Sequence, residues 1–276
     1  MILQRTRDFE FIRDLIWDKS GIYFETTKRR YFLRRLQTRM KVLGCSSFKE
    51  YYHILQSDAS GGELSELLNL LTTTETYFFR NAPQLQSFEE EILPELIKRK
   101  EQLDPRHLHL WSAGCSSGEE AYTIAMILLD TIPMIDQWKI TIVGTDINTQ
   151  VLEKARAGVY AKRSLRDTPQ KYIDRYFHIE DDHYRVCDRV KNMVTFRVGN
   201  LINQDDSSII QNVDCVFCRN VLIYFNIESC RHVIQIFYEN LARNGYLLLG
   251  HSESLYRISA IFTLVKLQHS LVYRKE

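Results

Sequence analysis

The sequence lacks the long apolar runs that a membrane span or a secretion signal requires. It has no stretch of about 18 consecutive apolar residues, and its first residues, MILQRTRDFEFIRD, contain no signal-peptide core. The 276 residues carry a formal net charge of only +1, so no global electrostatic field selects nucleic acid or a membrane surface. The six cysteines are scattered, unlike a secreted disulfide framework. We therefore expect a cytoplasmic protein with one large or two smaller domains.

The first hundred residues show the apolar spacing of helices and little β-alternation. The clearest example is the set Phe32, Leu36, Met40 and Leu43. A loop is expected at Ser57–Gly62, which is rich in Ser, Asp and Gly. The β-branched run Thr72–Thr74 is expected to end the apolar helix before it.

From about residue 107 the pattern changes to strands that alternate with helices. The expected strands are HLHLWSAG, KITIVGTDI, VTFRVGN, VDCVFCRN, GYLLLGH and a terminal hairpin of TLVKLQ with SLVYRK. The expected helices follow Gly118, run from Asn148 as N-cap to Tyr160, and cover Glu228–Ala242. This order predicts a mostly parallel sheet with helices on both faces. Residues 161–193 are polar and aromatic and are interpreted as an insertion, with a possible short strand pair in DDHYRVCDRV.

Two features mark the carboxyl edge of this sheet, where ligands bind in such folds. The turn Ser112–Gly118 is made of small residues, which let a backbone approach a cofactor at a helix N-terminus. It contains only Gly114 and Gly118, so it is not a full dinucleotide fingerprint, and an ordinary tight turn is the alternative. Asp146 ends the second strand, where a carboxylate can accept ribose hydroxyls or begin a helix. Together they indicate an adenosine-type cofactor, nicotinamide or sulfonium.

The strand ending in CRNVLIYF brings an amide, a guanidinium and a phenol to the same edge. The amide of Asn220 can meet a cofactor or an acyl substrate. The phenol of Tyr224 can orient an acceptor, or it can simply pack at an apolar strand end.

Six motifs in order make the sequence resemble a known family. They are TTTETYFFRN, LWSAGCSSGEEAYTIAM, GTDINTQVLEKARAGVY, VGNL, FCRNVLIYF and GHSE. Together they resemble the CheR family of chemotaxis receptor methyltransferases over nearly the whole chain. The resemblance implies an α/β fold: a Rossmann-like class I methyltransferase with a mixed seven-stranded sheet. It also implies a small all-helical N-terminal domain with its linker (residues 1–82), a methyltransferase domain (83–276) and a small β-subdomain insertion (161–193).

The resemblance further implies an enzyme that transfers a methyl group from S-adenosylmethionine to glutamate side chains of chemoreceptors. The products are methyl esters and S-adenosylhomocysteine. The implied cofactor contacts are Thr74, Thr76, Arg80, Gly114, Glu119, Asp146, Asn200, Leu201, Asn220 and Val221. The family often has Asn at the position of Thr74, and a hydroxyl cannot replace both the donor and the acceptor of an amide.

Arg80 and Tyr224 are the residues expected beside the reacting atoms. A glutamate acceptor is already ionised at pH 7, so no general base is needed. Catalysis should then depend on positioning, water exclusion and charge complementarity.

The segment Lys28–Lys41 has seven Lys or Arg residues and no acid. On a helix, Lys28, Arg35 and Arg39 share a stripe beside the apolar face. In the family a basic N-terminal helix recognises the substrate, so these three are expected to bind the acidic methylation helices of chemoreceptors. Nucleic acid is the rival partner, but one basic helix in a neutral chain is weak support for it.

Other signals are discounted. Cys215 and Cys218 have metal-site spacing but lie in an apolar strand without further ligands, so no metal is expected. GHSES lacks the closing Gly of a hydrolase elbow. The loop around His178–Tyr184 is short and has no Gly, unlike that of family members which bind a receptor's C-terminal tethering peptide. We therefore expect a monomeric, tether-independent enzyme. The alternatives are a methyltransferase with another acceptor, or a cofactor-binding signalling scaffold.

Overall fold

The computed structural model describes residues 2–103, 105–204 and 210–276. The N-terminal part is helical, and its amphipathic helices pack around a shared core that includes Ile12, Phe32, Leu36 and Leu67. Its elements are α1 (Ile2–Ser20), η1 (Thr26–Lys28), α2 (Arg29–Leu43), α3 (Phe48–Ser57) and α4 (Gly62–Leu71). Helix α4 ends at Leu71, and Thr72 is its extended C-cap, as the β-branched run predicts. Within described residues, no helix is long and apolar enough to cross a membrane.

The central element is a mixed seven-stranded sheet in the order β6-β2-β1-β7-β8-β10-β9. Strands β6, β2, β1, β7 and β8 are parallel, and β10 is antiparallel to both β8 and β9. The strands are β1 (His107–Ala113), β2 (Lys139–Asp146), β6 (Val194–Val198), β7 (Val213–Cys218), β8 (Leu241–Leu249), β9 (Thr263–Lys266) and β10 (Leu271–Arg274). This confirms the predicted fold class and the terminal hairpin.

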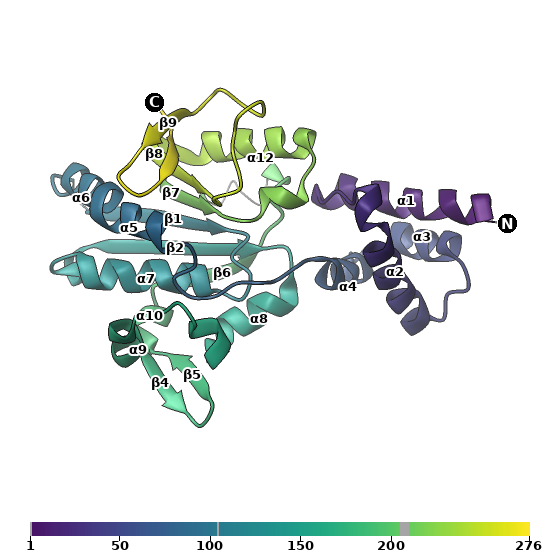
Figure 1. Cartoon of the computed structure of the whole chain (residues 1–276), viewed down its shortest axis with the longest axis horizontal. Helices are drawn as coiled ribbons and strands as arrows, with labels where there is room; N and C mark the ends of the chain where they lie inside the picture. Colours follow the sequence, from purple (N-terminus) through teal and green to yellow (C-terminus); the bar gives the residue numbers. More distant parts are fainter. Residues whose placement is uncertain (1, 104, 205–209) are drawn as a thin grey trace.

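Helices cover both faces of the sheet (Figure 1). Alternate residues of β7 point to opposite faces, so Phe217 belongs to one core and Val216 to the other. The first core is covered by α5 (Ala82–Ser87), η2 (Phe88–Ile92), α6 (Leu93–Lys100), α7 (Glu119–Thr131) and α8 (Thr149–Ala157). The second is covered by α12 (Ile227–Asn240). The turn η3 (Ile135–Gln137) precedes β2, and η5 (Leu222–Tyr224) follows β7.

The insertion is a separate three-stranded antiparallel sheet in the order β3-β5-β4. Its elements are β3 (Val159–Ala161), η4 (Lys162–Leu165), α9 (Gln170–Tyr176), β4 (Phe177–Glu180), β5 (His183–Val186) and α10 (Asp188–Lys191). The prediction that the helix after Asn148 reaches Tyr160 is wrong, because Gly158 takes a left-handed conformation and ends α8. The strand pair also lies further toward the N-terminus than predicted, with Asp181 and Asp182 at its turn.

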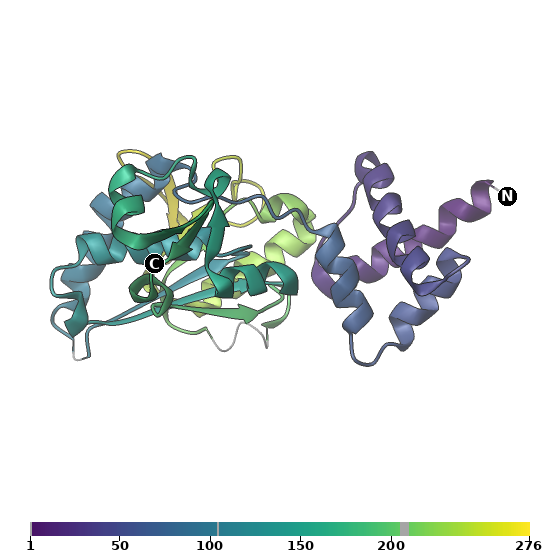
Figure 2. The same ribbon diagram turned by 90° about the horizontal axis from the view of Figure 1, so that it is seen from below.

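Helices α1–α4 lie beside the sheet as a distinct unit in both views (Figures 1 and 2). One attachment is a β-bridge between Ile22 and Phe225, extended by a 2.9 Å hydrogen bond from Tyr23 N to Tyr224 O. A second joins α4 to the start of α8. There the Asn69 side chain donates to Thr149 Oγ1 at 3.0 Å and accepts from Thr149 N at 2.9 Å. Trp17 Nε1 also donates to Ser229 Oγ at 3.0 Å, so the helical unit is fixed to the sheet domain at several points.

Candidate active site

A cleft of about 560 Å³ opens at the carboxyl edge of the sheet, between the β-bridge and the contact of α4 with α8. One wall comes from the ends of β1, β2 and β7, and the other from residues 20–31 and 71–77. Its size suits a nucleoside-containing cofactor together with part of an acceptor. The predicted residues that line it are Lys28, Thr74, Thr76, Arg80, Gly114, Asp146, Asn200, Leu201, Asn220, Val221 and Tyr224.

The turn after β1 forms the floor of the cleft. Its backbone is tied to β2, because Gly114 N and Cys115 N both donate to Thr145 O, at 2.8 and 2.9 Å. Gly114 has φ +77°, and a Cβ at this position would lie 2.5 Å from Val221 Cγ2. Only glycine therefore allows the loops after β1 and β7 to approach this closely. The turn and the loop after β7 therefore line the cleft side by side.

Asp146 lies where β2 ends, and backbone amides hold its carboxylate on both sides. Ser116 N donates to Oδ2 and Asn148 N donates to Oδ1, both at 2.8 Å. Burial raises the pKa of Asp146, and these hydrogen bonds oppose that rise. Each oxygen keeps a further lone pair, so the carboxylate can accept two neighbouring hydroxyls such as those of a ribose.

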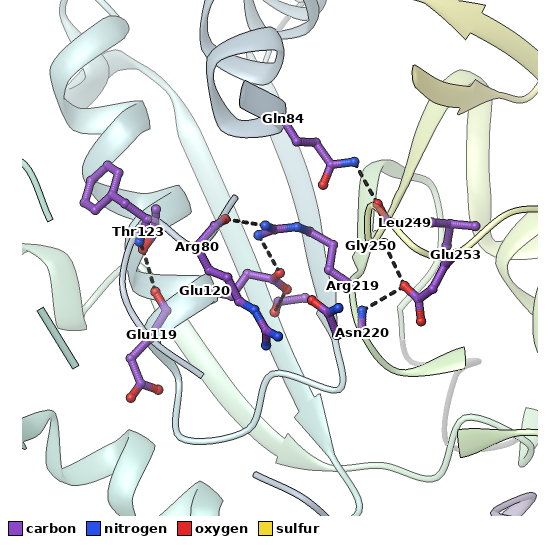
Figure 3. A network of polar contacts seen from close by, with 12 residues as sticks. Arg80, Gln84, Glu119, Glu120, Thr123, Arg219, Asn220, Leu249, Gly250 and Glu253 are labelled. Atoms are coloured by element: carbon purple, nitrogen blue, oxygen red, sulfur yellow. Dashed lines mark hydrogen bonds and ion pairs between the residues drawn. The ribbon is translucent and has the colours of Figure 1, made fainter. Parts of the chain in front are cut away.

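A buried ion pair stands at the end of β7. Arg219 is 8% exposed and donates to Glu120 Oε2 at 3.1 Å and also to the main-chain oxygen of Arg80 (Figure 3). Glu120 Oε1 accepts a 2.6 Å hydrogen bond from Ser112 Oγ. This network joins β1, α7, β7 and the segment before α5, and Glu120 also lines the cleft.

Glu119, which the resemblance implies as a cofactor contact, lies outside the cleft lining. It is 2% exposed, and its carboxylate accepts a 2.7 Å hydrogen bond from Ser117 Oγ. Adjacent residues of a helix point about 100° apart, so only one of the two glutamates can face the cleft. That residue is Glu120, which the sequence analysis missed because GEE alone does not fix the phase of the helix.

Arg80 reaches the cleft from a sharply turned segment. Its neighbours Phe79 and Asn81 have φ of +56° and +60°. Its guanidinium donates to Glu75 O at 2.9 Å and lies 5.5 Å from the centre of the Tyr77 ring. The guanidinium is thus held by a carbonyl and a ring and keeps its charge available to an anionic group.

On the other side of the cleft a cation and a phenol lie together. Lys28 Nζ, from the turn before α2, lies 5.7 Å from the centre of the Tyr224 ring. Lys28 is exposed, while Tyr224 is half-buried and fixed through its main-chain oxygen by Tyr23. This pair can receive a carboxylate from solvent.

The structure separates the three members of the predicted basic stripe. Arg35 lies behind the cleft lining, with its guanidinium 5.1 Å from the ring centre of the lining residue Tyr31. Arg39 instead donates to Glu63 through Nε at 3.0 Å, and Tyr51 donates to the same carboxylate at 2.6 Å. The side chains of Arg39 and Glu63 are only 14% and 9% exposed. We therefore withdraw Arg39 as a substrate contact, because it holds α2 to α4.

The cysteines with metal-site spacing are buried in β7. Burial raises the pKa of the Cys215 and Cys218 thiols, which disfavours the thiolate that a metal ion needs. Among described residues, no group of three or more His, Cys, Asp or Glu side chains is arranged to hold a metal ion.

Comparison with known proteins matches two family models to the chain. The model described as "CheR methyltransferase, SAM binding domain" matches residues 74–271, and "CheR methyltransferase, all-alpha domain" matches residues 7–72. The chain is 40% identical over 270 residues to chemotaxis protein methyltransferase 2 of Vibrio cholerae, covering 97% of this chain and 92% of that protein. It is 34% identical over 261 residues to the chemotaxis protein methyltransferase of Escherichia coli, covering 93% and 87%. The corresponding Borreliella burgdorferi protein is 33% identical over 243 residues, covering 87% and 86%.

Proposed function

Because the chain belongs to the CheR methyltransferase family, we propose that its acceptors are glutamate side chains of chemoreceptors, which become methyl esters. The family membership makes it an S-adenosylmethionine-dependent enzyme of chemotaxis. The observation that carries the glutamate assignment is the pair of Lys28 and Tyr224, which both line the cleft, with the ammonium 5.7 Å from the ring centre.

The residues of the cleft fit S-adenosylmethionine. The turn at Gly114 lines the cleft with its backbone, and Asp146 offers acceptors for the ribose hydroxyls of the cofactor. The proposed contacts are Thr74, Thr76, Arg80, Gly114, Glu120, Asp146, Asn200, Leu201, Asn220 and Val221. When bound, the cofactor supplies an electrophilic methyl group on a sulfonium, so the proposed reaction uses no metal.

The chain's own residues then position the acceptor. Lys28 attracts the carboxylate, and the Tyr224 hydroxyl orients the oxygen that receives the methyl group. Arg80 holds a carboxylate of the cofactor or of the acceptor. The helical unit supplies one wall of the cleft, which limits the access of water to the bound acceptor. An ionised acceptor needs no base, so these steps suffice.

The proposed partner surface begins at the mouth of the cleft. Lys28 is exposed just before α2, and the half-buried Arg35 of α2 adds a second positive charge, so that the two complement the acidic methylation helix of a receptor. In this arrangement residues 1–82 recognise the substrate and residues 83–276 carry the transfer, in a monomer acting in the cytoplasm. Neither nucleic acid nor membrane insertion has a part in it.

We also propose that recognition does not depend on a receptor's C-terminal tethering peptide. The hairpin of β4 and β5 is joined by only Asp181 and Asp182, a turn shorter than the Gly-containing loop that we expect in peptide-binding members of the family. Calorimetry with such a peptide should show no saturable binding. A tight complex would contradict the proposal.

The decisive experiment measures methyl transfer from radiolabelled S-adenosylmethionine to receptor-containing membranes. We expect label in the receptor as a base-labile ester, lost when the methylation-helix glutamates are replaced by alanine. Base-stable label, or label on small molecules only, would overturn the acceptor assignment.

A further inference from the structure

One carboxylate outside the cleft lining, that of Glu253, accepts hydrogen bonds from three backbone amides of two loops. Figure 3 shows two of these partners, Asn220 and Gly250. Oε2 of Glu253 accepts from Asn220 N at 2.8 Å and from Gly250 N at 2.7 Å. Oε1 accepts from Ile223 N at 3.3 Å. These amides lie beyond the ends of β7 and β8, where no neighbouring strand can pair with them. The Glu253 carboxylate therefore accepts the hydrogen bonds that a neighbouring strand would accept within the sheet.

The bond to Asn220 supports an unusual backbone. Asn220 has φ +62°, a left-handed conformation that costs free energy for a residue with a side chain. This conformation ends β7 sharply and turns Asn220 and Val221 to line the cleft. A charged acceptor forms the stronger kind of hydrogen bond, which suits it to hold such a turn.

The loop that carries Glu253 is itself shaped for this contact. A Cβ on Gly250 would lie 2.7 Å from Glu253 Oε2 and 2.8 Å from Asn220 N. Glycine at 250 is therefore what allows the two loops to approach. On the other side, the buried Gln84 donates to Leu249 O at 2.7 Å and fixes the end of β8.

We infer that Glu253 is a positioning residue for methyl transfer. It touches neither cofactor nor acceptor, and it acts through Asn220 and Val221 on the cofactor side and through Ile223 on the placement of Tyr224. The inference rests on the proposed cofactor site, because it assigns Glu253 to the loop that forms part of that site.

Two substitutions test it in the full-length protein. Glu253→Ala removes both acceptor oxygens and with them all three hydrogen bonds, so we expect the Kd for S-adenosylhomocysteine and the KM for S-adenosylmethionine to rise about tenfold or more. Glu253→Gln keeps one acceptor oxygen and places an NH2 group against a donor. If the Gln oxygen still accepts from the amides of Asn220 and Gly250, the Kd for S-adenosylhomocysteine should change by less than about threefold. The kcat should still fall about tenfold, because the hydrogen bond from Ile223 is lost and Tyr224 shifts. The KM for receptor should be unchanged in both.

The matched control is Glu91→Gln, which alters another carboxylate that accepts a backbone N–H, from Gln268 at 2.9 Å, away from the cleft. It should leave Kd, KM and kcat at their original values. A purely structural role for Glu253 would lower the Tm and the active fraction without changing Kd or KM, and that result would overturn the inference. If the unaltered protein itself binds no S-adenosylhomocysteine, the proposed cofactor site fails instead.

Discussion

The main-chain N–H of Ser116 lies 2.8 Å from the Asp146 carboxylate, so the turn after β1 and the end of β2 form one hydrogen-bonded unit. The sequence presents them as two independent motifs. In the folded chain the acid both shapes the turn and faces the cleft, and changes at either residue should affect the other.

Replacing Asp146 with Asn should separate binding from stability. Asparagine has one acceptor oxygen and sets its NH2 group against a backbone donor, so affinity for S-adenosylhomocysteine should fall about tenfold or more. Burial raises the pKa of Asp146, which means that its charge at neutral pH costs stability, and removing it offsets part of the lost hydrogen bonding. The unliganded protein should therefore lose little unfolding free energy. Calorimetry and urea unfolding measure the two effects, with Asp136→Asn, whose side chain is 90% exposed, as control.

Gly114→Ala should be much more harmful than Gly44→Ala. Both glycines have positive φ, +77° and +72°, but an added Cβ meets Val221 at position 114 and nothing within 4 Å at position 44. Gly44→Ala should cost about 1–2 kcal/mol of unfolding free energy for the backbone alone. Gly114→Ala should cost about 2–5 kcal/mol, because the overlap adds to it. Combining Gly114→Ala with Val221→Ala should recover the part of the unfolding free energy that is lost to the steric overlap. Equal losses of unfolding free energy at the two glycines would contradict the close approach of the loops.

Arg39→Ala should mainly lower the unfolding free energy, whereas Arg35→Ala should mainly raise the KM for receptor. Loss of Arg39 leaves the Glu63 carboxylate with Tyr51 as its remaining close partner, and should lower the unfolding free energy by about 2–3 kcal/mol. Loss of Arg35 removes one cation–π contact worth about 0.5–1 kcal/mol but should raise the KM for receptor. Urea unfolding and receptor methylation kinetics distinguish them. A stable Arg39→Ala protein with a raised receptor KM would restore the original assignment of Arg39.

The histidines at the start of β1 should make stability depend on pH. Burial lowers the pKa of His109, whose Nδ1 lies 3.1 Å from Gln211 O, with Lys100, Lys139 and Asp214 nearby. Below about pH 6.5 the imidazole of His109 therefore binds a proton in the unfolded chain and stays neutral in the folded chain. The free energy of unfolding consequently falls as the pH decreases through this window. His109→Gln should reduce this slope in urea unfolding. The exposed His53→Gln should leave the slope as it is, and an identical slope in the His109 variant would refute the assignment.

Local signals in the sequence were sufficient for most of the fold. Strand periodicity placed the sheet, and Asn148 was correctly predicted as a cap, since its side chain accepts from Val151 N at 3.1 Å. The helix that begins after Asn148 was predicted to be too long. Gly158 is the ordinary stop signal of a helix, yet the prediction continued past it to Tyr160.

The site was less accessible from the sequence, because it depends on long-range contacts. The residues around Arg39 in the sequence do not predict its ion pair with Glu63, because Glu63 lies on another helix. Helix phase, set by the packing of α7, decides between Glu119 and Glu120. The three amides that converge on Glu253 are likewise visible only in the folded chain.

The bridge between Ile22 and Phe225 limits how this chain can be recombined. A boundary near residue 73 separates the two family models, but the cleft takes its walls from both sides of that boundary. A chimera that takes its helical N-terminal domain from a relative would therefore combine one cleft wall from that relative with the other wall from this chain. It should work only if residues 20–24 of the donor still match the surface around Phe225, so the two halves are expected to evolve together.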